Sequence, residues 1–216
     1  MPRSHAYLLW SLLALPAVLI LWQAMHATNP EIYGDLAHPA AEFAARLMIV
    51  AMMITPLMLF FKGSEALRWL RKSRRALGVA AFAYAALHVT FYLIDRGTSA
   101  KVLADLSEPY IWAGWLGLII LVPLAVTSND YFLRKLGRRW KPLQKWTYAV
   151  AALTLLHWAA IHDWQSPAEA VLHFAPLLGL QAYRIWYWTL RPRAPRGLQP
   201  VALRVSAPVS KRAQPR

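Results

Sequence analysis

The sequence predicts an all-α integral membrane protein, a bundle of six transmembrane helices with both termini in the cytoplasm. Hydrophobic residues make up 58% of the 216 residues, and the mean hydropathy is +0.33 although the net charge is +14. The apolar residues occur in blocks of about 20, the length that crosses a bilayer as a helix. Six such blocks can be drawn, at residues 8–27, 44–61, 76–95, 110–127, 147–164 and 169–188.

The first block follows Arg3 and precedes small residues, as a signal peptide would. Its apolar run is longer than the roughly 7–15 residues of a signal core, so we expect a retained helix. Residues 1–190 then form one membrane domain. The segment 191–216, rich in Pro, Arg, Ala and Ser, is predicted to be a disordered cytoplasmic tail. The chain has no cysteine, which excludes disulfides, thiolate metal sites and iron–sulfur clusters.

The distribution of charge predicts the orientation. Lys and Arg gather in segments 62–75, 128–146 and 189–216, whereas the alternate connections collect Asp and Glu. Positive loops remain in the cytoplasm, so the acidic connections are expected outside. The basic character is therefore a topology signal, with some affinity for anionic lipid headgroups, and requires no nucleic acid.

Two histidines occupy comparable positions in separate blocks. His88 lies seven residues before Asp95 at the outer end of the third block, and His157 lies seven before Trp164 at the outer end of the fifth. At a rise of about 1.5 Å per residue, each lies about 10 Å below the outer surface. A haem iron takes two axial imidazoles from opposite faces of one plane, which requires histidines at equal depth. Such six-coordinate iron favours electron transfer.

Other interpretations of these histidines remain open. Each could be a buried histidine that hydrogen-bonds to a neighbouring helix, and His173 in the sixth block is a further candidate ligand. A transporter or proton channel could use His88 and His157 as a relay. An intramembrane metalloenzyme is a third interpretation, but the chain has no HExxH pattern and two histidines make a poor catalytic zinc site.

Three segments carry a resemblance to a known family. They are ARLMIVAMMITPL (45–57), SRRALGVAAFAYAALHVTFY (73–92) and LAVTSNDYFLRKLGRRWKPLQKWTYAVAALTLLHWAAIHDW (124–164). In this order they resemble the second, third, and fourth-to-fifth helices of the haem-binding membrane subunit of bacterial periplasmic methionine-sulfoxide reductase, a member of the ferric-reductase-like transmembrane group. The resemblance implies a six-helix cytochrome b in the bacterial inner membrane, with FMN as a further cofactor.

The resemblance also implies roles for individual residues and partners. His88 and His157 correspond to the haem-ligand histidines of the family. The family often has a histidine where this chain has Gln144, and relatives that stack two haems would place a ligand at Arg74. We therefore expect one haem b, on the outer side. Electrons would pass from the respiratory quinone pool to a periplasmic molybdopterin-containing methionine-sulfoxide reductase, so substrate reduction would occur on the partner subunit.

The sequence allows more than one electron donor and more than one role for the basic residues near the helix ends. A quinol or a cytoplasmic flavin reductase is the expected donor. Arg74 and Arg75, with the basic residues 138, 139 and 141, could bind the phosphate of FMN, or could be positive-inside residues without a ligand. Arg46 could pair with a haem propionate or with Glu42 one turn away.

Overall fold

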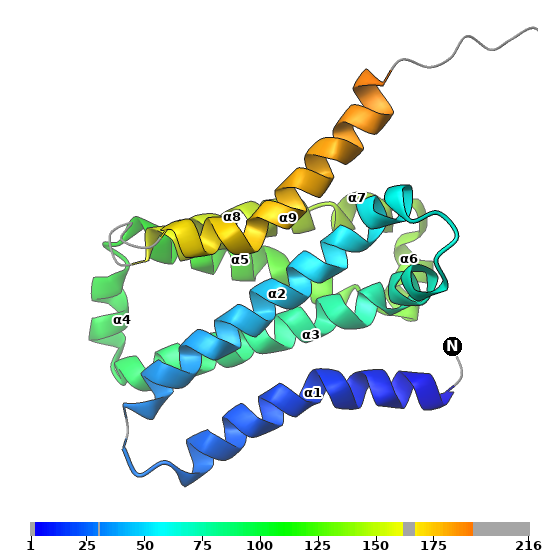
Figure 1. Cartoon of the computed structure of the whole chain (residues 1–216). Helices are drawn as coiled ribbons and strands as arrows, with labels where there is room; N and C mark the ends of the chain where they lie inside the picture. Colours follow the sequence, from blue (N-terminus) through cyan, green and yellow to red (C-terminus); the bar gives the residue numbers. More distant parts are fainter. Residues whose placement is uncertain (1–2, 30, 162–166, 192–216) are drawn as a thin grey trace, which may run out of the picture.

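The computed structural model describes residues 3–29, 31–161 and 167–191, and these residues form helices and connecting turns (Figure 1). The long helices are α1 (Arg3–His26), α2 (Ile32–Phe60), α3 (Glu65–Arg96), α5 (Pro109–Val126), α8 (Thr147–Ala160) and α9 (Pro167–Ile185). Short helices connect them: α4 (Ser99–Asp105), α6 (Asp130–Leu136), the 3₁₀ turn η1 (Gly137–Arg139) and α7 (Trp140–Gln144). The π-helical turn η2 (Trp186–Leu190) continues α9.

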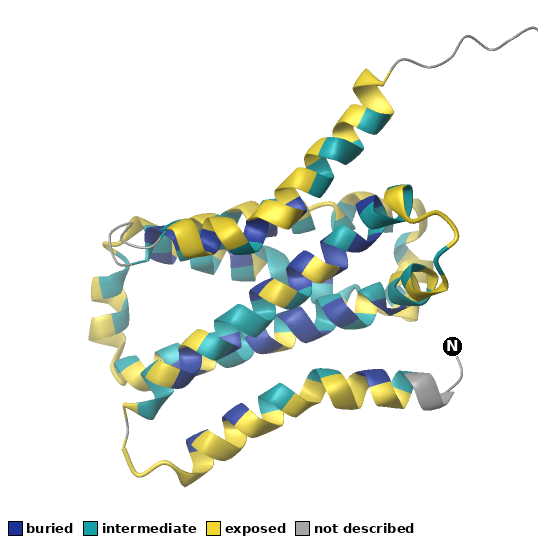
Figure 2. Ribbon diagram, in the orientation of Figure 1, coloured by how far each residue is buried: buried dark blue, intermediate teal, exposed yellow. Residues whose placement is uncertain are grey.

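The structure confirms an all-helical, multi-pass membrane protein. The helices α1, α2, α3 and α5 are long and apolar enough to cross a bilayer. Many large apolar side chains, such as Trp10, Leu15 and Trp22 of α1, face outward, and most of α1 is exposed in Figure 2. Lipid rather than water is the solvent that suits such a surface. Six spans and the orientation of the termini remain predictions.

The fifth predicted span differs in length from its helix. The helix α8 has 14 residues and ends at Ala160, four residues before the predicted end. At Ile161 the backbone turns to ψ 140°, which is incompatible with a continuing helix. His157 therefore lies in the last turn of α8 rather than two turns from its end. Trp164 and the predicted tail beyond Arg191 lie outside the described residues.

The bundle is built on the antiparallel pair α2 and α3, against which α5, α8 and α9 pack (Figure 1). Ser64 caps α3 by accepting a hydrogen bond from the Leu67 N–H, and Gly97 ends it in the left-handed conformation at φ 68°. Among the described residues, one buried cluster receives side chains from all five helices: Met48, Ile49, Met52, Ala81, Leu124, Val150, Ala151, Phe174 and Leu177.

A tyrosine of α3 binds the backbone of α1, in addition to the apolar contacts that Ile20 and Ala24 make with α2 and α3. Pro16 lacks an N–H and disturbs the helical ladder of α1. Beside it, the Tyr84 hydroxyl donates to the Leu13 carbonyl at 2.8 Å and accepts from the Ala17 N–H at 2.9 Å. In an uninterrupted helix the Ala17 N–H would donate to the Leu13 carbonyl. The Tyr84 hydroxyl therefore bridges two backbone groups that usually bond to each other. A side chain of α3 thus satisfies polar backbone groups of α1 that lipid could not.

Candidate functional site

The structure brings His88 of α3 and His157 of α8 together inside the bundle. Their ring centroids are 6.4 Å apart, and the ring planes are inclined by 72°. A metal held at about 2.0 Å by one nitrogen of each ring would separate the two centroids by roughly 6.3 Å. The side chains therefore stand at the separation that an iron bound between them requires.

Backbone carbonyls determine which nitrogen of each ring is available. The Nδ1 of His88 lies 2.9 Å from the Ala37 carbonyl oxygen, and the Nδ1 of His157 lies 2.7 Å from that of Tyr110. A carbonyl oxygen only accepts, so each Nδ1 carries the hydrogen and each Nε2 keeps its lone pair. Metal-bound histidines are usually oriented by such a bond from the second ring nitrogen. Both rings are thus held in the tautomer whose Nε2 is free to bind a metal.

A cavity of about 330 Å³ adjoins the two rings. Its volume lies within the range of about 300–1,000 Å³ that is typical of ligand and cofactor sites. Small side chains form much of its wall and keep the space between the helices open. They are Ala41, Ala44, Ala45, Ala81, Ala85, Ala113, Gly114 and Gly117.

Gly114 of α5 permits the close approach that positions His157. A Cβ atom built at residue 114 would lie 3.0 Å from both Cε1 and Nδ1 of the His157 ring. Such a contact is shorter than ordinary van der Waals separation, so any larger residue would displace the ring. The glycine thus allows the ring to reach the Tyr110 carbonyl one turn earlier on α5. No feature of the sequence alone identified this residue.

Arg96 is a cation of the cavity wall that the sequence analysis missed. It follows His88 by eight residues on α3 and lines the same cavity, as does Tyr92. Its Nε lies 2.7 Å from Asp105 Oδ2, which also accepts a hydrogen bond from the Tyr92 hydroxyl at 2.8 Å. The spacing of about two helical turns from His88 was the signal that could have revealed it.

The other two outer candidates lie beside the cavity and do not line it. Arg46 forms an ion pair with Glu42, the second of the two alternatives considered for it. The ring of His173 contacts that of Trp158 in a tilted arrangement with centroids 4.8 Å apart, and His173 Nε2 lies 3.4 Å from Arg46 Nη2. His173 is therefore engaged with Arg46 and Trp158.

A second cavity, of about 930 Å³, lies between the first one and the end of the bundle that carries α6 and α7. Met48, Ala81 and Leu121 line both cavities, so they form an apolar partition between them. The described wall of the second cavity contains no histidine. Seven cations line it: Arg71, Lys72, Arg74, Arg75, Lys141, Lys145 and Arg184.

Arg74 and Gln144, the two positions at which the resemblance would place ligands of a second haem, both line this inner cavity. Arg74 donates to the Thr55 hydroxyl at 3.2 Å, and the Gln144 amide donates to the Leu124 carbonyl at 3.1 Å. Arg75 binds Asp130, and this hydrogen bond holds the pKa of the Asp130 carboxyl below its usual value. Arg138 and Arg139, which were grouped with Arg74, do not line the cavity.

Comparisons with known proteins agree with this helical arrangement. The model of the family described as "Ferric reductase like transmembrane component" matches residues 40–155, more than half of the chain. The chain belongs to this ferric-reductase-like family. Proteins of Brucella melitensis biotype 2 and of Brucella ovis are each 34% identical to it over 202 residues, which cover 90% of this chain and 89% of theirs. Both are named protein-methionine-sulfoxide reductase heme-binding subunit MsrQ. No solved structure matches the chain.

Proposed function

We propose that this protein is a b-type cytochrome subunit of the bacterial inner membrane. In this proposal it relays electrons from the respiratory quinone pool to a periplasmic, molybdopterin-containing methionine-sulfoxide reductase that repairs oxidised proteins. The names of the Brucella relatives support the haem and the reductase partner. One observation of the chain itself carries the proposal: the ring centroids of His88 and His157 lie 6.4 Å apart, and both Nδ1 atoms are bonded to carbonyls.

The residues around the cavity fit one haem b with two axial histidines. The group supplies one-electron redox chemistry when bound. His88 and His157 would hold the haem iron, and ligation by two imidazoles would favour electron transfer over substrate chemistry. The alanine and glycine wall would exclude water from the ring faces, and Arg96, which pairs with Asp105 and also lines the cavity, would lie near a propionate.

The inner cavity extends this proposal to the donor side. Seven cations around about 930 Å³ fit an anionic cofactor, and the phosphate of FMN has the required charge. Arg74 and Arg75 would bind it, with Lys141 opposite. A flavin there would lie next to the outer cavity, because Met48, Ala81 and Leu121 line both spaces. A quinol or a cytoplasmic flavin reductase would supply the electrons.

A reconstituted relay tests the function. We expect that a quinol reduces the haem of the full-length protein in proteoliposomes. Addition of the periplasmic reductase and methionine sulfoxide should then reoxidise it. The variant His88→Ala should support neither step, whereas His26→Ala, on the exposed end of α1, should behave as the wild type. Equal sulfoxide reduction with His88→Ala would contradict the proposal, and a colourless wild type would favour the transporter interpretation.

Flavin binding tests the inner cavity. Charge-assisted hydrogen bonds contribute about 1.5–3 kcal/mol each, so Arg74→Gln should weaken FMN binding by roughly ten- to a hundredfold. The quenching of flavin fluorescence by the purified protein measures this affinity. Lys62→Gln removes a neighbouring charge that does not line the cavity and serves as the matched control. Equal affinities for Arg74→Gln and wild type would place the flavin elsewhere.

A further inference from the structure

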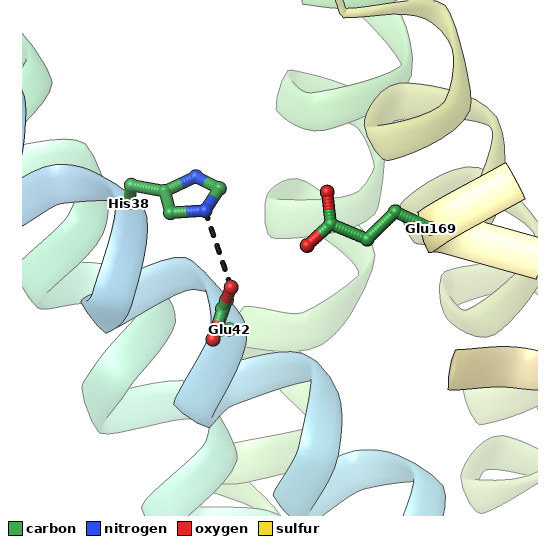
Figure 3. A group of neighbouring side chains, drawn as sticks. All are labelled: His38, Glu42 and Glu169. Atoms are coloured by element: carbon green, nitrogen blue, oxygen red, sulfur yellow. Dashed lines mark ion pairs between the residues drawn. The ribbon is translucent and has the colours of Figure 1, made fainter. Parts of the chain in front are cut away.

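A second group of metal-ligating side chains lies between the N-terminal part of α2 and the first turn of α9. His38 and Glu42, one turn apart on α2, face Glu169 in the first turn of α9 (Figure 3). One ligand atom of each residue lies within 4.8 Å of those of the other two. None of the three lines either cavity, so this group is separate from the proposed haem and flavin sites.

The charges of this group are incompletely balanced. Glu42 Oε1 lies 3.2 Å from His38 Nε2, and its other oxygen pairs with Arg46. The Glu169 carboxylate points toward this pair, and within the described part of the chain it has no hydrogen-bond or ion-pair partner. Two carboxylates at this separation repel each other unless a cation lies between them. Arg46 is already paired with Glu42 on the side away from His38.

We propose that His38, Glu42 and Glu169 bind a divalent zinc ion. Zinc takes one imidazole nitrogen and carboxylate oxygens at about 2.0–2.2 Å, in tetrahedral geometry. The edge of such a tetrahedron is about 3.3 Å, close to the 3.2 Å between His38 Nε2 and Glu42 Oε1. Glu169 closes the third position by a rotation of its exposed side chain, and water fills the fourth.

The site would join two helices that are far apart in the sequence. The helices α2 and α9 run in the same direction, and the pairs His38–Glu42 and Glu169–His173 repeat the i to i+4 spacing on each. His173 contacts both Arg46 and Trp158, the neighbour of His157 in the sequence. A bound zinc would therefore fasten α9 to α2 beside the helix turn that holds His157. We expect the zinc to stabilise the packing of α9 against α2.

Zinc titration of the haem-loaded, full-length protein tests this inference. The protein is purified without a histidine tag, treated with EDTA, and titrated with zinc against a chromogenic chelator. We expect one zinc per chain in the wild type, and a zinc-dependent rise of the thermal unfolding midpoint. His38→Ala and Glu169→Gln should each weaken the affinity at least about tenfold and abolish the rise.

Glu169→Gln is the most informative variant because its carboxylate makes no other contact that the structure describes. His26→Ala removes an exposed histidine that bonds only within its own helix, to the Trp22 carbonyl, and should retain the zinc. An unchanged haem spectrum confirms that each variant is folded and that zinc does not displace the haem. The inference is overturned if the wild type binds no stoichiometric zinc, or if both α2 and α9 variants bind it with wild-type affinity. Neither of these two results would contradict the proposed electron relay, because the relay does not depend on zinc.

Discussion

His88→Ala and His157→Ala are each expected to abolish the b-type spectrum of the purified protein. Each substitution removes one of the two imidazoles whose centroids lie 6.4 Å apart, and the described lining of the cavity contains no third histidine. The haem iron would then have one histidine ligand instead of two, and the affinity of the protein for haem would fall by several orders of magnitude. The dithionite-reduced minus oxidised spectrum, with haem quantified per chain, measures this loss.

The control for these variants is a histidine outside the cavity. His173→Ala removes the weaker candidate ligand, and we expect it to retain the full Soret and α bands because His173 engages Arg46 and Trp158 instead. Loss of haem in His173→Ala with retention in His157→Ala would reassign the second ligand to α9. Retention in both His88→Ala and His157→Ala would reject the site altogether.

Gly114→Ala is expected to lower haem occupancy although residue 114 has no side chain to contribute. The added Cβ would lie 3.0 Å from two atoms of the His157 ring and would push Nδ1 away from the Tyr110 carbonyl. Loss of an outer-shell partner of this kind typically reduces metal affinity by about 10–100-fold. A haemin titration of the apoprotein, followed at the Soret band, measures the change.

Gly179→Ala provides the matched control, because a Cβ there meets nothing within 4 Å. It makes the same chemical change in α9 and should leave the haem affinity unaltered. If Gly114→Ala binds haemin as tightly as Gly179→Ala, then the hydrogen bond between His157 and Tyr110 does not position the ring. In that case the close approach of α5 would be a packing feature alone.

Much of the fold and part of the candidate site could be predicted from the sequence, because the membrane imposes a simple rule. Backbone groups in lipid must be satisfied within a helix, so each apolar block becomes a helix whatever surrounds it. The predicted block at 110–127 agrees with α5 to within one residue at each end. His88 and His157 could be paired in advance because helical rise converts sequence position into depth.

The remaining features depend on contacts between helices, which periodicity does not encode. Arg46 and Arg96 are both cations near the outer helix ends, and only the packing shows that Arg96 lines the cavity while Arg46 pairs with Glu42.

By itself, the sequence determined the helical class, the membrane environment and the two central histidines, since these follow from composition and spacing along one chain. Only the tertiary structure decided the histidine tautomers, the need for glycine at 114 and the meeting of Glu169 with His38. These depend on the rotation of each helix about its axis, which packing against neighbouring helices sets.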